Sequence, residues 1–158
     1  MSKKSHKNFL FRESDSNSAA FSAILLWARI VFGFLFMSHG IAKWIMFKDI
    51  AETFPDPIGM GSEVSFWLVL FAEILCSLGF MLGALFRLCL IPMIFTMCIA
   101  VFVIHAGDPL VKVEPAMMYL TIFILMYIIG PGKFSIDNIL SRFHDVFLIS
   151  KWWWATHV

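Results

Sequence analysis

Two histidines, a lysine and two carboxylates are the residues whose types and spacing could do chemistry. His39 and Lys43 are four positions apart, so on a helix they share one face. His105 ends one apolar run and Glu114 precedes another, with Asp108 between them. An imidazole exchanges protons near neutral pH, an ammonium group holds negative charge, and a carboxylate orients a ligand or accepts a proton.

These groups allow two kinds of site. Two histidines with a carboxylate could ligate a metal ion, but a lysine beside them disfavours a dense cation site. An anion or a quinone oxygen suits a lysine and two imidazoles better. We therefore predict His39, His105 and Glu114 as catalytic residues and Lys43 and Asp108 as ligand-binding residues, with no metal. Each residue also has a plain alternative: Lys43 could extend to the membrane interface, and Glu114 could only favour a helix N-terminus.

A second pair of charges lies deeper in the apolar sequence. Arg29 is about nine residues into the first apolar run and Glu73 is near the middle of the second. A charge at the centre of a spanning helix costs about 2.5–3.5 kcal/mol on insertion scales, so each group needs a partner. Counting from the helix ends gives similar depths, and we predict an Arg29–Glu73 ion pair. It would hold two helices in register or pass protons.

Composition sets the class of protein that must position these groups. The chain has 158 residues, of which 60% are hydrophobic and 15% charged, an apolar excess for a soluble domain. The excess falls into four runs long enough, or nearly so, to span a bilayer: Ala20–Phe47, Val64–Leu85, Leu88–Ala106 and Pro115–Ile129. We predict an all-α integral membrane four-helix bundle. The net charge of +1 gives no reason to expect a nucleic-acid partner.

Alternating helix directions then bring distant residues together. The C-terminal end of the first run, the C-terminal end of the third and the N-terminal end of the fourth lie on one side of the membrane. His39, Lys43, His105 and Glu114 are therefore expected at one level. Glycines at small-residue spacing, Gly79 and Gly83 among them, predict close helix packing. The three cysteines form no CxxC pair and are interpreted as small buried side chains.

The segments that flank the bundle set its orientation. Residues 1–18 are predicted to be a flexible cytoplasmic tail before a membrane domain over 19–133. Residues 134–158 are predicted to form an amphipathic interfacial helix with a tryptophan-rich tail. Lysines and arginines are concentrated in the termini and the second connection, and acidic residues in the other two. This bias predicts that both termini lie in the cytoplasm.

Five stretches in this order resemble the DoxX family: RIVFGFLFMSHGIAK, AEILCSLGFMLGALFR, His105, EPAMMYL and GPGKFSID. The resemblance covers roughly residues 24–138. It implies a four-helix protein of the bacterial inner membrane that is linked to quinone-coupled redox chemistry, since relatives include the membrane subunit of a thiosulfate:quinone oxidoreductase. It implies a quinone as ligand, a soluble or membrane redox partner, and the following characteristic positions: Arg29, His39, Lys43, Glu73, His105 and Glu114.

Several functions stay open from the sequence. The first is a quinone-linked oxidoreductase subunit or membrane partner of a redox complex. The second is a non-enzymatic scaffold or assembly factor in the lipid bilayer, and the third is a small transporter, which would need to be a homo-oligomer. A thiol oxidoreductase is disfavoured because no CxxC motif is present.

Overall fold

The computed structural model describes residues 19–141, and every regular element within them is helical. Two of these elements are π-helices, labelled η, in which each turn is wider than in an α-helix. In chain order the elements are α1 (Ala19–Ile45), α2 (Phe47–Ile50), α3 (Ser62–Leu70), η2 (Phe71–Cys76), α4 (Ser77–Leu82), α5 (Phe86–Ile99), η3 (Ala100–Ile104) and α6 (Leu110–Ile129).

Consecutive elements join into four spans that are long and apolar enough to cross a membrane: Ala19–Ile45, Ser62–Leu82, Phe86–Ile104 and Leu110–Ile129. Helices suit this setting because they pair their backbone polar groups within one segment, where lipid offers no partner. The predicted all-α membrane bundle is confirmed. The fourth span begins five residues before the predicted Pro115, because Pro109 precedes its first turn and Pro115 lies inside the helix.

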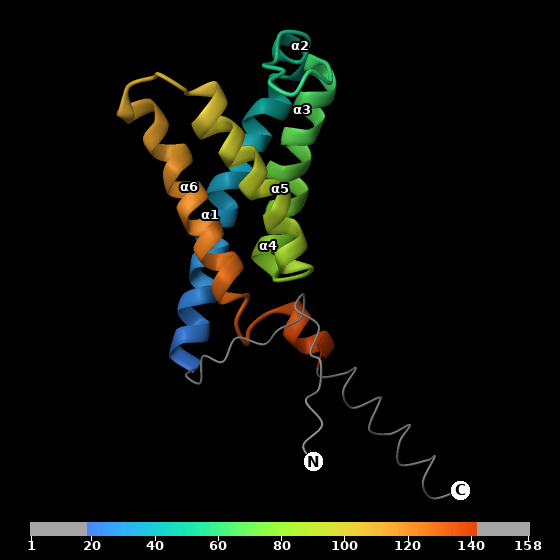
Figure 1. The fold of residues 1–158 in the computed structure, drawn as a ribbon. Helices are drawn as coiled ribbons and strands as arrows, with labels where there is room; N and C mark the ends of the chain where they lie inside the picture. The colour runs from blue at the N-terminus through green and yellow to red at the C-terminus, as the bar shows by residue number, and fades with distance from the viewer. Residues whose placement is uncertain (1–18, 142–158) are drawn as a thin grey trace, which may run out of the picture.

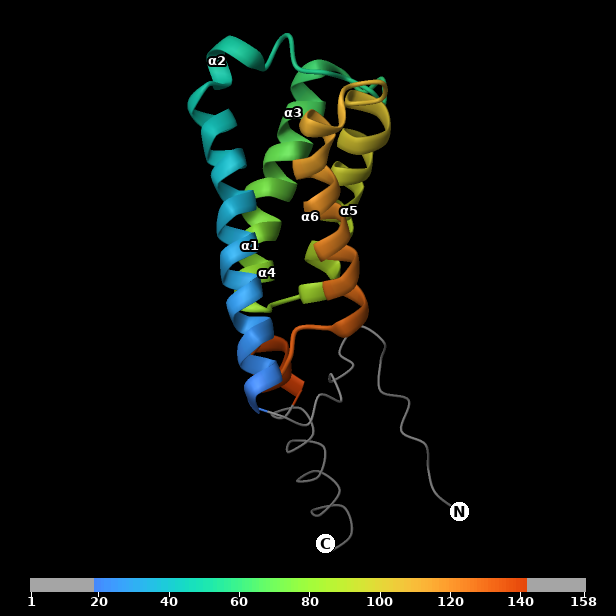
Figure 2. The ribbon, with the colours of Figure 1, turned by 90° about the vertical axis from the view of Figure 1, so that its left-hand side faces the viewer.

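The four spans run side by side, and the connections divide between the two ends of the bundle (Figures 1 and 2). We call the end that holds residues 46–61 and the turn after η3 the distal end. The proximal end holds the start of α1, the turn at 83–85 and residues 130–141. Residues 1–18 and 142–158, which include the predicted cytoplasmic tail and most of the predicted interfacial helix, lie outside the described residues; 136–141 are helical.

Aromatic and sulfur side chains fill the centre of the bundle. Phe80 and Phe86 stack with their ring centroids 5.2 Å apart, and Phe123 of α6 contacts both Phe36 and Phe80 edge-on. These rings connect all four spans in one core. A smaller cluster of Ala51, Phe66 and Leu70 joins the distal connection to α3.

A network of hydrogen bonds around Asp137, which we call the proximal network, closes the proximal end. Its carboxylate accepts hydrogen bonds from the backbone N–H groups of Leu85 (2.8 Å) and Phe86 (2.9 Å), and so caps the N-terminus of α5. Its own N–H donates to the Gly83 carbonyl at 2.9 Å. Gly83 has φ +66°, and a Cβ there would meet the Arg29 side chain and Ser135. Only glycine suits this turn.

Candidate functional site

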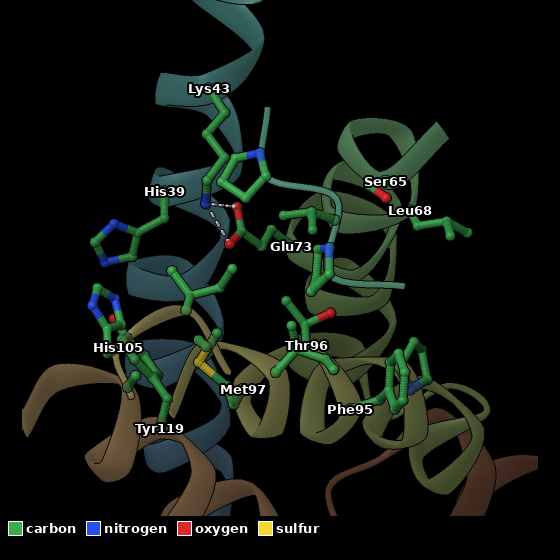
Figure 3. A pocket seen from close by; sticks show the side chains of 18 of the residues that line it. His39, Lys43, Ser65, Leu68, Glu73, Phe95, Thr96, Met97, His105 and Tyr119 are labelled. Carbon is green, nitrogen blue, oxygen red and sulfur yellow. Dashed lines mark hydrogen bonds and ion pairs between the residues drawn. The ribbon is translucent and has the colours of Figure 1, made fainter. Parts of the chain in front are cut away.

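A cavity of about 540 Å³ lies in the distal half of the bundle, and all four spans contribute to its wall. Residues of the distal connection, Pro55, Pro57 and Ile58, also line it. Most of the remaining wall is apolar. Its polar members are His39, Lys43, Ser65, Glu73, Thr96, His105, Lys112 and Tyr119. Figure 3 shows how the labelled side chains lie around this space.

Lys43 and Glu73 form an ion pair at the centre of the cavity wall (Figure 3). The Lys43 Nζ lies 2.5 Å from Glu73 Oε1 and 2.6 Å from Oε2, so both carboxylate oxygens accept from it. The Glu73 side chain is 3% exposed and that of Lys43 is 29% exposed. A carboxylate this buried needs a cationic partner, and the lysine supplies one while part of it stays accessible.

Close helix contact brings this pair together. A Cβ built on Gly40 would lie 2.8 Å from the Glu73 Cβ and 2.7 Å from Ile74 Cγ1. Glycine at this position therefore lets α1 approach η2 directly opposite Glu73. Side chains on a helix tilt toward its N-terminus, so Lys43, one turn further along α1, extends back to the carboxylate. Glu73 itself lies in a π-helix, a rare element that is frequent at functional sites.

His39 and Tyr119 form the second polar part of the cavity. Their rings meet edge to face, with centroids 5.9 Å apart. Neither the His39 ring nitrogens nor the Tyr119 hydroxyl has a hydrogen-bond partner among residues 19–141. Both groups line the cavity. They are therefore free to bind a polar ligand, and both can donate or accept a hydrogen bond.

His105 follows the last residue of η3, and its ring forms a hydrogen bond with Asp108 in the turn after it. Its Nδ1 is 3.0 Å from Asp108 Oδ2, and Lys112 Nζ is 3.8 Å from the other oxygen. The contact with His105 is the main reason that the pKa of Asp108 lies below its ordinary value. The carboxylate fixes one ring nitrogen, and the ring itself lines the cavity. In Figure 3 His39, His105 and Tyr119 occupy the same side of the cavity.

Glu114 and Asp108 do not line the cavity, although both were predicted site residues. Lys112, Pro115, Ala116 and Tyr119 face the cavity from α6, which is the i, i+3, i+4, i+7 pattern of one helix face. Glu114 lies off that face and is exposed. Glu114 therefore lies near the distal end of α6, as predicted from the topology, but outside the cavity wall. Asp108 contacts two residues that line the cavity, His105 and Lys112.

The predicted Arg29–Glu73 pair is also wrong. Arg29 is fully buried, but its Nη2 donates to the Phe134 carbonyl and its guanidinium lies over the Phe86 ring, 6.0 Å from the centroid. Arg29 is eleven residues before Gly40, which lies beside Glu73. This corresponds to about 16 Å along the helix. Arg29 extends toward the N-terminus of α1 and therefore lies beside the proximal network.

The remaining observations concern metal ligands, the cysteine thiols and cavity residues that were not predicted. Within residues 19–141, no group of three or more His, Cys, Asp or Glu side chains could hold a metal ion. The thiols of Cys76 and Cys89, which the sequence did not pair, contact each other between the second and third spans. Tyr119 lies in the EPAMMYL stretch, but neither it nor Thr96 was predicted as a cavity residue. The prolines of the distal connection were not predicted either, since they stand in a loop segment.

Comparison with protein families gives a match to DoxX over residues 24–106, which is more than half of the chain. The matched region contains most of the first span and all of the second and third, and it includes His39, Lys43, Glu73 and His105. Helix α6 with Tyr119 lies beyond it. Comparisons with curated proteins and with solved structures gave no match. With four membrane-spanning helices and this match, the chain is a multi-pass membrane protein that belongs to the DoxX family.

Proposed function

We propose that this protein binds a quinone in the distal cavity and serves as the membrane subunit, or membrane partner, of a quinone-linked oxidoreductase. The observation that supports this proposal is the cavity itself: about 540 Å³ of space inside the membrane-spanning part, with apolar walls and a cluster of polar groups. Small-molecule sites have this volume and this mixture of a largely apolar wall with a few placed polar groups.

The polar groups match the chemistry of a quinone headgroup. Its two carbonyl oxygens accept hydrogen bonds. The donors available are the His39 and His105 rings, the Tyr119 hydroxyl and the Lys43 ammonium group. Glu73 holds Lys43 in place and can take up a proton when the lysine moves to a ligand oxygen. Two histidines at one cavity can deliver or remove protons near neutral pH.

Reduction of a bound quinone to a hydroquinone takes two electrons and two protons. In this proposal the protons pass through His39 and His105, and a soluble or membrane oxidoreductase that docks on this protein supplies the electrons. The distal end faces away from the cytoplasm in a bacterial inner membrane. The segments before α1 and after α6, together with the start of α5, carry eight of the twelve lysines and arginines. Only Lys43, Lys48 and Lys112 stand near the distal ends of the spans, and this bias favours the proposed orientation.

Quinone binding to the purified full chain in lipid nanodiscs tests the proposal. Titration with a short-chain ubiquinone, followed by quenching of tryptophan fluorescence, should give saturable binding. Loss of one hydrogen bond to a ligand removes about 1 kcal/mol, so His39→Ala and His105→Ala should each weaken binding about fivefold. Lys43→Met should weaken it at least as much.

Matched variants outside the cavity provide the controls. Glu114→Gln and Lys48→Met change exposed residues that do not line the cavity, and both should bind like the unchanged protein. If His39→Ala, His105→Ala and Lys43→Met all bind the quinone as tightly as the unchanged protein, the proposed site is refuted. Co-purification of a partner with every variant, together with no measurable quinone binding, would instead favour a scaffold.

A further inference from the structure

One side of the distal cavity is formed by large apolar side chains that are about half exposed. Leu68 of α3 is 45% exposed, Phe71 of η2 is 48% exposed and Phe95 of α5 is 54% exposed. All three also line the cavity. A side chain that contacts both a cavity and the outside marks a place where the wall is one residue thick, and here that place lies between the second and third spans.

The depth of these residues shows what surrounds them. Phe71 is nine residues from the distal start of its span at Ser62, and Phe95 is nine residues from the distal end of its span at Ile104. At 1.5 Å per residue both lie about 14 Å below the distal helix ends. This is close to the middle of a hydrocarbon core about 30 Å thick. The thin wall therefore faces acyl chains rather than water.

The two histidines and Tyr119 lie on one side of the cavity, and the opposite side is mostly apolar (Figure 3). In Figure 3 His39, His105 and Tyr119 occupy one side of the view. Leu68 and Phe95 occupy the opposite side, with the Lys43–Glu73 pair between the two groups. Glu73 is eleven residues from the distal start of its span at Ser62, and Tyr119 is nine residues from the distal start of α6 at Leu110. At 1.5 Å per residue these polar groups lie about as deep as Phe71 and Phe95. A ligand that fills this space therefore has its polar head and its apolar part at a similar depth, with the apolar part directed between the second and third spans.

We propose that the cavity opens sideways to the bilayer between α3–η2 and α5, and that this opening, bounded by Leu68, Phe71 and Phe95, holds the isoprenoid tail of the quinone. This inference rests on the proposed function and deepens it, because it specifies a long-tailed lipid quinone that comes from the membrane. A water-soluble quinone without a tail fills only the polar half of the cavity.

Photo-crosslinking of the full chain in nanodiscs tests the opening directly. One ubiquinone analogue carries an azide on the ring, and a second carries a diazirine in the second isoprene unit of the tail. After irradiation, peptides are mapped by mass spectrometry. The ring azide should label the regions of His39 and His105, and the tail diazirine should label the regions of Leu68, Phe71 and Phe95. Tail labels on α1 or α6 would overturn the proposed opening.

A pair of variants in the second span tests the same point by binding. Leu68→Trp adds bulk at the opening, and Leu78→Trp is its control, because Leu78 is 48% exposed in the same span but does not line the cavity. Leu68→Trp should weaken binding of a ubiquinone with an eight-isoprene tail at least tenfold and leave the tailless headgroup within twofold. Leu78→Trp should change neither.

The possible results distinguish failure of the lateral opening from failure of the quinone site. Equal binding of the long-tailed quinone by the two tryptophan variants, with saturable binding of the headgroup, would refute the opening and leave the quinone site. Absence of specific labelling by the ring azide, together with no saturable headgroup binding, would refute the quinone site itself. A diffuse label along all four spans from the tail probe would also count against the opening.

Discussion

Removal of the Lys43 ammonium group should destabilise the protein, and a second substitution at Glu73 should restore most of the loss. In Lys43→Met a carboxylate that is 3% exposed loses both hydrogen bonds from its cation. Breaking a buried ion pair costs about 3–5 kcal/mol. The low end, about 3 kcal/mol, applies here because 29% of the lysine side chain is accessible.

The double variant Lys43→Met/Glu73→Met should be more stable than Lys43→Met alone by about 2 kcal/mol, since replacing both members of a buried pair with apolar residues is often nearly neutral. Glu73→Met alone should cost less than Lys43→Met, because the freed lysine can extend to the distal interface. The free energy of unfolding is measured by titration of the purified protein with sodium dodecyl sulfate, followed by tryptophan fluorescence.

Arg29 supplies the control for this cycle. Arg29→Met and Glu73→Met lie about 16 Å apart along the bundle, and their effects should add within about 0.5 kcal/mol. Two results would refute the reasoning. One is a Lys43→Met/Glu73→Met variant that is no more stable than Lys43→Met, and the other is strong coupling between Arg29 and Glu73.

Three further substitutions test the two ends of the bundle. Gly83→Ala should lower the free energy of unfolding by about 2–4 kcal/mol, because φ +66° disfavours an L side chain and the new Cβ meets Arg29 and Ser135. Gly107→Ala is the control, because Gly107 has φ +92° but open space around the new Cβ; an equal loss of stability there would contradict the steric part of this reasoning. Asp137→Ala should cost about 1–2 kcal/mol through the lost cap of α5, and hydrogen exchange should rise at Leu85 and Phe86 rather than at the distal end. The pKa of Asp56 is lowered by hydrogen bonds from the Ser65 hydroxyl and from backbone N–H groups, that of Gly61 foremost. A carboxyl whose folded pKa is depressed stabilises the folded state above its ordinary pKa and loses that contribution as pH falls through the lowered value; protection of residues 57–61 from hydrogen exchange should therefore fall below about pH 4, and Asp56→Asn should remove this pH dependence.

Much of the architecture was predictable because hydrocarbon imposes a simple rule on the chain. Long apolar runs must be helices, and their alternation correctly placed His39, Lys43 and His105 at one level of the bundle, where all three line one cavity. The start of the fourth span was misplaced because Pro115 was interpreted as a first-turn proline. Pro109 holds the position before the helix instead.

The partners of the buried charges could not be obtained by counting residues. Depth estimates placed Arg29 and Glu73 within a few ångströms of each other, but such estimates ignore the direction in which a long side chain extends. Both basic residues of α1 extend toward its N-terminus, so Lys43 reaches Glu73 and Arg29 reaches Phe134. The role of Tyr119 also needed coordinates, since a tyrosine in an apolar run has no sequence signal that distinguishes a cavity from a core.

Because of the two π-helical segments, deletion of a single residue within a span would rotate the cavity residues on one side of the deletion relative to the rest of the span. A normal α-helix advances about 100° per residue, and a π-helix absorbs one residue more in each turn. Deletion of a single residue within Phe71–Cys76 would let that span become regular without losing its ability to cross the bilayer. The same deletion would rotate the part of the span before it by about a quarter turn relative to the part after it, carrying Ser65 and Leu68 off the cavity while Phe80 stays in the core. Insertion or deletion scanning along Ser62–Leu82 would therefore separate the length that the membrane requires from the rotation that the cavity requires.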